Sequence, residues 1–182
     1  RIMTWFAKRQ GADFNKISVV NTAPAGLASY ILADGAAAVH MWDPGYDLLK
    51  SRKPEIRTLD LKIAETWKDF TGGSAIPYLG VAAHTSWVEK NRHLIPKLFN
   101  AYKDAAEWTL ANPDEASTKV VGKATPEAQK AVAQLIRDNK RLGMNVQWPS
   151  EVQKEMLSIY KVGIDVGLMS KDPGAQTLYS GP

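Results

Sequence analysis

The stretch that decides the fold is residues 17–47, ISVVNTAPAGLASYILADGAAAVHMWDPGYD. Its β-branched opening at residues 17–20 predicts a strand. Pro24 suits the first turn of a helix, which we expect to end at Gly35. Residues 36–41 are almost wholly apolar, as is typical of a strand covered by helices on both faces. A strand, a helix and a second strand in this order predict an α/β fold.

An aromatic and acidic turn, Trp-Asp-Pro-Gly-Tyr, follows the second expected strand directly. In an α/β sheet, ligands bind just beyond the carboxyl ends of the strands. We therefore predict that Trp42, Asp43 and Tyr46 contact a small molecule, and two large rings favour an organic ligand. Three packing alternatives stay open. Trp42 would fill the gap between strand and helix, Asp43 would cap the next helix, and Tyr46 would lie in the core.

Thr22 and Ala23 stand at the expected start of the first helix in this stretch. The N-terminus of a helix presents free backbone N–H groups, which suit a carboxylate, a sulfonate or a phosphate. Both residues are therefore ligand-binding candidates. The alternative is a simple cap, for which Thr22 is the better residue type.

Beyond residue 47 the pattern predicts further strands at 56–59 and from Tyr78 to residue 83, and then mainly helices. One helix is expected over residues 92–111, with an apolar face formed by Leu98, Phe99, Tyr102, Ala105, Ala106 and Leu110. Another follows Pro126, with Val132, Leu135 and Ile136 on one side. Gly72-Gly73-Ser74 is expected to be a flexible loop. Five tryptophans accompany helical apolar spacing and are predicted to pack in the core or at the interface between lobes: Trp5, Trp67, Trp87, Trp108 and Trp148.

Three segments together resemble a known family. Residues 32–44, LADGAAAVHMWDP, are similar to the "Gly-x-x-Asp-Ala-Ala, strand, Trp-x-Pro" pattern of the nitrate/sulfonate/taurine and thiamine-precursor type of ABC-transporter substrate-binding protein. Residues 85–91 (TSWVEKN) and 111–116 (ANPDEA) are similar to later segments of the same family. The resemblance covers most of the chain up to about residue 121.

The resemblance implies a two-lobed periplasmic-binding-protein fold of type II. Residues 1–76 would form most of lobe two, and residues 77–182 the crossover strand and the C-terminal helices that return to lobe one. Because the family's chain crosses between lobes near Ser74 and Tyr78, these two residues are further ligand-binding candidates. Their alternative is an ordinary loop. With Arg at position 1 and no signal peptide, we expect the first lobe to lie upstream in a longer precursor.

The function implied is that of the solute-binding component of an ABC importer. It would hold a small organic or anionic ligand between two lobes and present it to a membrane permease. Its place would be the periplasm, or the outer face of the membrane through a lipid anchor. A chain lacking its first lobe would bind ligand weakly and would expose apolar surface, which favours self-association. Two alternatives remain: the effector-sensing domain of a transcription regulator with the same architecture, and a small hydrolase or transferase.

Composition and motifs narrow these classes. The chain has 182 residues, 45% of them hydrophobic, and a net charge of +4. Its basic residues are spread along the sequence, which argues against a nucleic-acid partner and mildly favours an anionic ligand. No cysteine is present, whereas the catalytic relatives in thiamine-pyrimidine synthesis and sulfinate cleavage depend on cysteines, so no enzyme is predicted.

No cofactor or metal is predicted either. The only adjacent glycine pair, Gly72-Gly73, lacks the Gly-Lys-Ser/Thr that completes a phosphate-binding loop. The three histidines, His40, His84 and His93, are too scattered for a helical metal pair. A Gly-x-Ser-x-Gly elbow, the usual setting of a serine nucleophile, is also missing.

Overall fold

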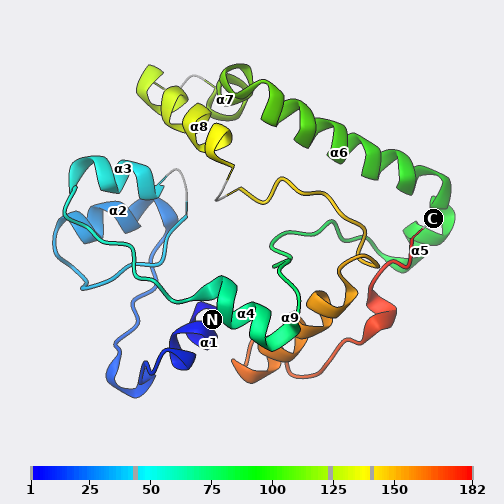
Figure 1. Cartoon of the computed structure of the whole chain (residues 1–182), viewed down its shortest axis with the longest axis horizontal. Helices are drawn as coiled ribbons and strands as arrows, with labels where there is room; N and C mark the ends of the chain where they lie inside the picture. Colours follow the sequence, from blue (N-terminus) through cyan, green and yellow to red (C-terminus); the bar gives the residue numbers. More distant parts are fainter. Residues whose placement is uncertain (1, 43–44, 123–124, 140–141, 182) are drawn as a thin grey trace. The chain divides into compact units, whose positions relative to one another are not determined.

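The computed structural model describes residues 2–42, 45–122, 125–139 and 142–181 (Figure 1). The described helices are α1 (Ile2–Arg9), α2 (Pro24–Leu32), α3 (Gly45–Arg52), α4 (Ile63–Thr71), α5 (Thr85–Lys90), α6 (Ile95–Ala111), α7 (Pro113–Val121), α8 (Pro126–Asp138) and α9 (Gln153–Asp165). Short 3-10 turns lie at Phe14–Lys16, Arg92–Leu94 and Ala175–Thr177.

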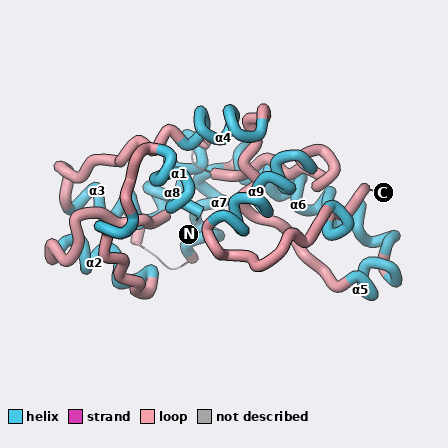
Figure 2. The backbone as a smooth tube through the Cα atoms, turned by 90° about the horizontal axis from the view of Figure 1, so that it is seen from below, coloured by secondary structure: helices cyan, strands magenta, loops and turns pink. Residues whose placement is uncertain are grey.

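The segments expected to be strands are the main difference from the sequence pattern. Within the described residues, Figure 2 shows helices and loops and no strand. Residues 17–20, 36–41, 56–59 and 78–83 run as loops, and large apolar side chains such as Leu59 and Leu79 are exposed. β-branched and apolar residues favour extended backbone, but a strand forms only where a neighbouring strand accepts its hydrogen bonds. The α/β two-lobed fold therefore stays a prediction.

The chain divides into two compact units. Unit 1 consists of Arg1–Phe14, Asp60–Ala111 and Asn139–Pro182, and unit 2 consists of Asn15–Leu59 and Asn112–Asp138. Both units are assembled from separate stretches of sequence. The predicted boundary at residue 76 lies inside unit 1, so this division does not follow the predicted one, and the assignment of residues to lobes stays a prediction.

Unit 1 has an aromatic core where α1, α4 and α9 meet. Trp5, Phe6, Trp67 and Val162 are almost fully buried. The rings of Trp5 and Phe6 lie edge to face with centroids 5.1 Å apart, a favoured geometry for aromatic pairs. The Arg9 guanidinium lies 3.8 Å above the centre of the Trp5 ring. Aromatic residues of α1 and α4, together with Val162 of α9, thus make the core.

The tryptophan predictions meet with mixed results. Trp5 and Trp67 are buried, which confirms their packing role. Trp148 is partly buried and stacks on Phe99, with ring centroids 3.9 Å apart. Trp87 and Trp108 are exposed at 41% and 38%, so neither is a core residue of this structure. Their packing at an interface between lobes stays a prediction.

Unit 2 contains two helix pairs, α2 with α3 and α7 with α8. Val132, Leu135 and Ile136 of α8 are buried, which confirms the predicted inner face. The Lys53 ammonium and the Asp34 carboxylate, 2.5 Å apart, join the end of α3 to the end of α2. Arg137 and Asp114 join α8 to α7 in the same way, also at 2.5 Å. Each pair thus has apolar contacts and an ion pair at its edge.

Helix α6 is mostly exposed. Of its 17 residues only Ala106 is buried, and the apolar face predicted from its spacing carries Leu98 and Tyr102 at 40% and 51% exposure. The described helices also include none that is both long enough and apolar enough to cross a membrane.

Candidate functional site

Trp42 lies just ahead of α3, and its side chain is 55% exposed. Its carbonyl oxygen accepts a hydrogen bond from the Gly45 amide at 3.1 Å, which closes a turn at the start of the helix. A ring that is more than half exposed does not fill a gap in a core. The structure therefore does not support the packing alternative for Trp42, and its contact with a ligand stays a prediction.

Tyr46 occupies the first turn of α3, one helical turn after Trp42, and is half-buried. Its hydroxyl group is 2.8 Å from Oγ1 of Thr58. Lys50, one turn further along, donates to the carbonyl oxygens of Pro54, at 2.6 Å, and of Ile56. These bonds attach residues 54–58 to α3. Tyr46 thus helps to fix the helix that follows Trp42, and the structure places the two rings at one end of α3. Asp43 lies outside the described residues.

Thr22 and Ala23 lie at the start of α2, and both are exposed. Ala23 is the N-cap residue, with no side-chain cap hydrogen bond, and Pro24 is the first helical residue. Of the two residues that the sequence offers for the N-cap position, the structure places Ala23 there and not Thr22. A Cβ atom on Gly26 would come within 3.1 Å of the Thr22 hydroxyl oxygen, so this hydroxyl lies over the first turn. A helix start without a side-chain cap suits an anion.

Ser74 and Tyr78 belong to unit 1, whereas the other described candidates belong to unit 2. Both side chains are exposed, Tyr78 to 73%. The turn before them is held from α4. The buried Thr71 hydroxyl oxygen accepts from the Gly73 amide at 3.0 Å, and the Trp67 indole N–H donates to the Ala75 carbonyl at 2.7 Å. These bonds indicate an ordered turn where the sequence predicts a flexible loop.

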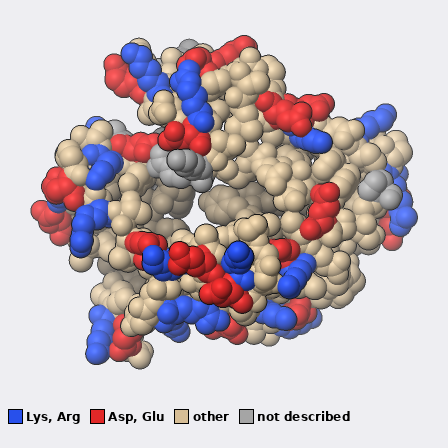
Figure 3. Space-filling view, viewed as in Figure 1, with Lys and Arg blue, Asp and Glu red and all other residues tan. Residues whose placement is uncertain are grey.

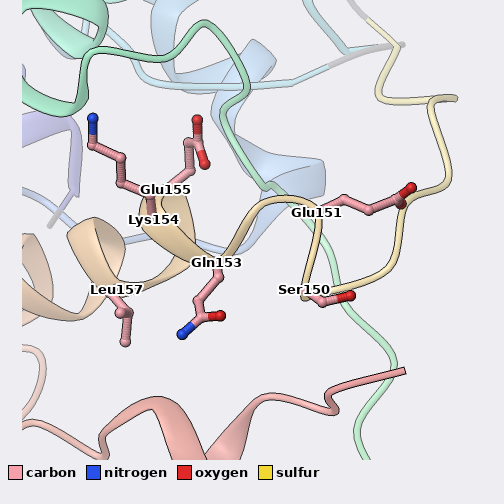
Figure 4. Close-up of a pocket in the computed structure, with 6 residues that line it drawn as sticks. All are labelled: Ser150, Glu151, Gln153, Lys154, Glu155 and Leu157. Carbon is pink, nitrogen blue, oxygen red and sulfur yellow. The ribbon is translucent and has the colours of Figure 1, made fainter. Parts of the chain in front are cut away.

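A shallow cavity of about 460 Å³ lies at the start of α9, in unit 1. Six residues line it: Ser150, Glu151, Gln153, Lys154, Glu155 and Leu157. All come from one continuous segment, and Figure 4 shows their side chains pointing in different directions. Ligand sites need a few polar groups that converge on one point. The sequence did not single out this segment, and its geometry does not make it a site.

Charged side chains of opposite sign lie next to one another on the described surface (Figure 3). Figure 3 shows Lys and Arg side chains interspersed with Asp and Glu over the face in view. A hydrogen bond from the Lys62 amide is the main cause that lowers the pKa of Asp60, and a hydrogen bond to Asp34 raises the pKa of Lys53. Asp60 is exposed and Lys53 is partly buried, and each is paired at a helix end. Among the described residues, no three His, Asp or Glu side chains are arranged to hold a metal ion.

Comparison with known proteins supplies the family. The family model described as NMT1/THI5 like matches residues 2–116. No curated protein and no solved structure matches the chain. The matched range contains all seven candidate residues and includes parts of both units. Since the match covers more than half of the 182 residues, the chain belongs to the NMT1/THI5-like family, whose members are mainly substrate-binding proteins of ABC transporters for nitrate, sulfonates and thiamine precursors.

Proposed function

We propose that this protein is the solute-binding component of an ABC importer. It captures a small organic or anionic ligand between two lobes of a type II periplasmic-binding fold and presents it to a membrane permease. The observation that carries the proposal is the family match over residues 2–116. Within that range, an exposed Trp42 stands where the sequence pattern predicts a ligand.

The proposed mechanism is a shift in a hinge equilibrium. A ligand held between two lobes gains contacts from both only when the lobes close. The ligand therefore raises the population of the closed form, and the size of the shift depends on how much more tightly it binds the closed form than the open form. The permease distinguishes the closed from the open binding protein, so the rate of transport follows the fraction of binding protein that holds ligand. No bond in the solute is made or broken in this cycle.

The candidate residues take distinct roles in the proposed site. The exposed indole of Trp42 forms a flat apolar wall, and Tyr46 braces the helix behind it through its contact with Thr58. Asp43, between them in sequence, accepts a hydrogen bond from a hydroxyl or amino group of the ligand. Ser74 and Tyr78, both exposed in unit 1, are candidates because the family's chain crosses between lobes near them.

The start of α2 suits the anionic part of the ligand. Ala23 leaves the first turn without a side-chain cap, and the Thr22 hydroxyl lies over that turn. Backbone N–H groups at this position favour a carboxylate, sulfonate or phosphate. The chain's net charge of +4 acts in the same direction. We propose an organic anion, with an apolar part against Trp42, and a location in the periplasm or at a lipid anchor outside the cytoplasm.

A thermal-shift panel on the protein expressed from its own gene tests this proposal. The panel contains nitrate, taurine, a longer alkanesulfonate, an aromatic carboxylate and an aminopyrimidine. Ligands that bind only the folded state raise the melting temperature with concentration. We expect one chemical class to do so, and organic anions to exceed nitrate. A melting temperature that none of these solutes changes would contradict the proposed ligand class.

A further inference from the structure

Asp34 and Gly35, just past the end of α2, form the single Asp-Gly sequence in the 182 residues, and the chain contains no Asn-Gly sequence. An aspartate before glycine is open to a self-modification in which the glycine nitrogen attacks the aspartate side chain, because glycine has no Cβ atom to hinder the approach. A bulkier residue at position 35 would slow this reaction. A Cβ atom there would lie 2.7–2.8 Å from three ring carbons of Tyr30, so packing against this ring favours glycine.

The modification needs water and no other reactant. A bond forms between the Gly35 nitrogen and the side-chain carboxyl carbon of Asp34, while the amide hydrogen and a carboxyl hydroxyl group leave together as water. The product is a five-membered succinimide ring. Water then adds across one of the two carbonyl–nitrogen bonds of the ring. One bond gives back aspartate, and the other gives isoaspartate, whose peptide bond runs through the side chain and lengthens the backbone by one carbon.

The end of α2 holds the attacking nitrogen in a hydrogen bond. Asp34 has a positive φ of 54°, and its amide donates to the Ile31 carbonyl at 3.0 Å. The Gly35 amide donates to the Tyr30 carbonyl at 2.9 Å. These two bonds are those of the Schellman motif, in which a left-handed residue, usually glycine, ends a helix. The Gly35 nitrogen can therefore attack only after its bond to Tyr30 opens.

The Asp34 side chain is held from a different helix. Helices α2 and α3 lie side by side in unit 2 (Figure 1). The Lys53 ammonium, just past the end of α3, lies 2.5 Å from Oδ1 of Asp34. The Lys53 side chain is 24% exposed and that of Asp34 is 84% exposed, so Lys53 is the better fixed of the two. Ring formation consumes the Asp34 carboxylate and therefore gives up this ion pair.

We infer that Asp34 and Gly35 are the isoaspartate-forming site of this chain, and that the folded end of α2 and Lys53 restrain the reaction. Isoaspartate moves the carboxylate away from its place beside Lys53. It also lengthens the backbone directly before residues 36–42, the segment that leads to Trp42. The modification therefore loosens the connection between α2 and α3. This inference concerns the chemistry of the chain itself and is independent of the family and of the solute.

A comparison of the folded and the unfolded natural chain tests the site and its restraint. Isoaspartate is counted with a protein isoaspartate methyltransferase, which transfers a labelled methyl group to isoaspartate and not to aspartate. Samples are incubated at neutral pH in buffer and in guanidinium chloride, and mass spectrometry of the tryptic peptide of residues 17–50 locates the label. We expect label at residue 34 in both samples. The rate in buffer should be lower by about tenfold or more, because the folded chain must first open both restraints.

Lys53→Met tests the ion pair. The variant keeps an unbranched side chain without the ammonium group, and we expect it to raise the rate in the folded chain roughly twofold to fivefold. Lys53→Arg keeps the charge and should stay close to the natural rate. Lys119→Met removes the ammonium paired with Glu115 in α7 of the same unit. It is the matched control and should not change the rate. Circular dichroism at the incubation temperature shows whether each variant is folded.

Asp34→Glu tests the position of the label. Glutamate keeps the carboxylate but cannot close a five-membered ring, so the label at residue 34 should disappear. Three results would overturn the inference: label that persists in Asp34→Glu or never appears at residue 34, equal rates in the folded and the unfolded natural chain, and a folded Lys53→Met variant that reacts no faster than Lys119→Met. The comparison of folded with unfolded protein uses the natural chain alone, so it decides the matter even if Lys53→Met does not fold.

Discussion

Trp42 is the residue on which ligand recognition is expected to depend most. Its ring is more than half exposed, so Trp42→Ala removes little core packing and should leave the melting temperature nearly unchanged. Loss of an aromatic contact of about 0.5–1.5 kcal/mol lowers ligand affinity roughly twofold to tenfold. Calorimetric titration with the ligand from the panel measures this change.

Trp87→Ala is the matched control for Trp42, because Trp87 is also an exposed tryptophan but lies in α5 of unit 1. We expect the Trp87→Ala variant to bind the solute with the affinity of the natural protein. If the Trp42→Ala variant also binds with that affinity, Trp42 is not part of the site.

Thr71 has a role that its position in the sequence does not reveal. Its buried hydroxyl accepts the Gly73 amide hydrogen bond. Thr71→Val keeps the shape but leaves that amide without its partner, at a cost of about 1–3 kcal/mol. Hydrogen exchange at Gly73 should become faster, whereas Thr71→Ser, which keeps the hydroxyl, should exchange at the original rate. Unchanged exchange in Thr71→Val would show that the hydroxyl does not hold the turn.

The sequence predicted a ligand contact for Trp42 because it follows an expected strand end. The structure shows that its side chain is exposed, and the contact stays a prediction. The sequence could not reveal that Thr71 and Trp67 hold the next turn. Those bonds depend on the exact angle at which α4 ends. Glycine and serine residues by themselves indicate a loop, but they do not indicate whether the loop is ordered.

At the scale of the element, the start of α4 is the clearest pH-sensitive feature. The Asp60 carboxylate accepts the Lys62 backbone amide at 2.9 Å and lies 3.0 Å from the Lys62 ammonium. These contacts, the backbone hydrogen bond above all, hold the pKa of Asp60 below its ordinary value of 3.8. The stability that Asp60 adds is therefore present above pH 3.8 and is lost as the pH falls through the lower pKa of the folded state.

Asp60→Asn tests this element directly. The variant cannot lose a proton, so its stability should change less than that of the natural chain as the pH falls below about 4. Denaturant unfolding at a series of acidic pH values measures the difference. Because a backbone hydrogen bond dominates, we expect the difference to persist in high salt, which screens exposed ion pairs. If the stability of both proteins falls equally as the pH is lowered below about 4, Asp60 does not have this role.

Trp67 joins α4 to the aromatic core of unit 1. It is buried against Trp5 and Phe6, and its indole N–H bonds the Ala75 carbonyl. Trp67→Ala should lower the free energy of unfolding by about 3–5 kcal/mol, as is usual for a large aromatic core residue. Denaturant unfolding followed by circular dichroism measures it. Trp87→Ala, at an exposed site, should cost less than about 1 kcal/mol, and equal losses in the two variants would contradict the described core.

Helices were more predictable than strands because a helix satisfies its hydrogen bonds within one segment. The apolar spacing of Val132, Leu135 and Ile136 was enough to place α8 and its inner face. A strand depends on a partner that its own sequence does not name. Residues 17–20 have the composition of a strand, yet they run as a loop in the structure.

At the scale of the whole molecule, two compact units each draw on separate parts of the chain. Periodicity within a window of some ten to twenty residues does not indicate which distant segments meet, and so the predicted boundary at residue 76 and the observed division differ. The family, in contrast, was recognisable from short motifs, because residues 32–44 resemble it in both spacing and residue type. The match over residues 2–116 confirms the family.

The central claim is that this protein holds a solute and releases it unchanged. The most direct measurement is a calorimetric titration of the protein expressed from its own gene, followed by mass spectrometry of the recovered ligand. We predict saturable binding of one organic anion per chain, with the ligand recovered intact. Absence of saturable binding, or a ligand recovered in chemically altered form, would contradict the claim.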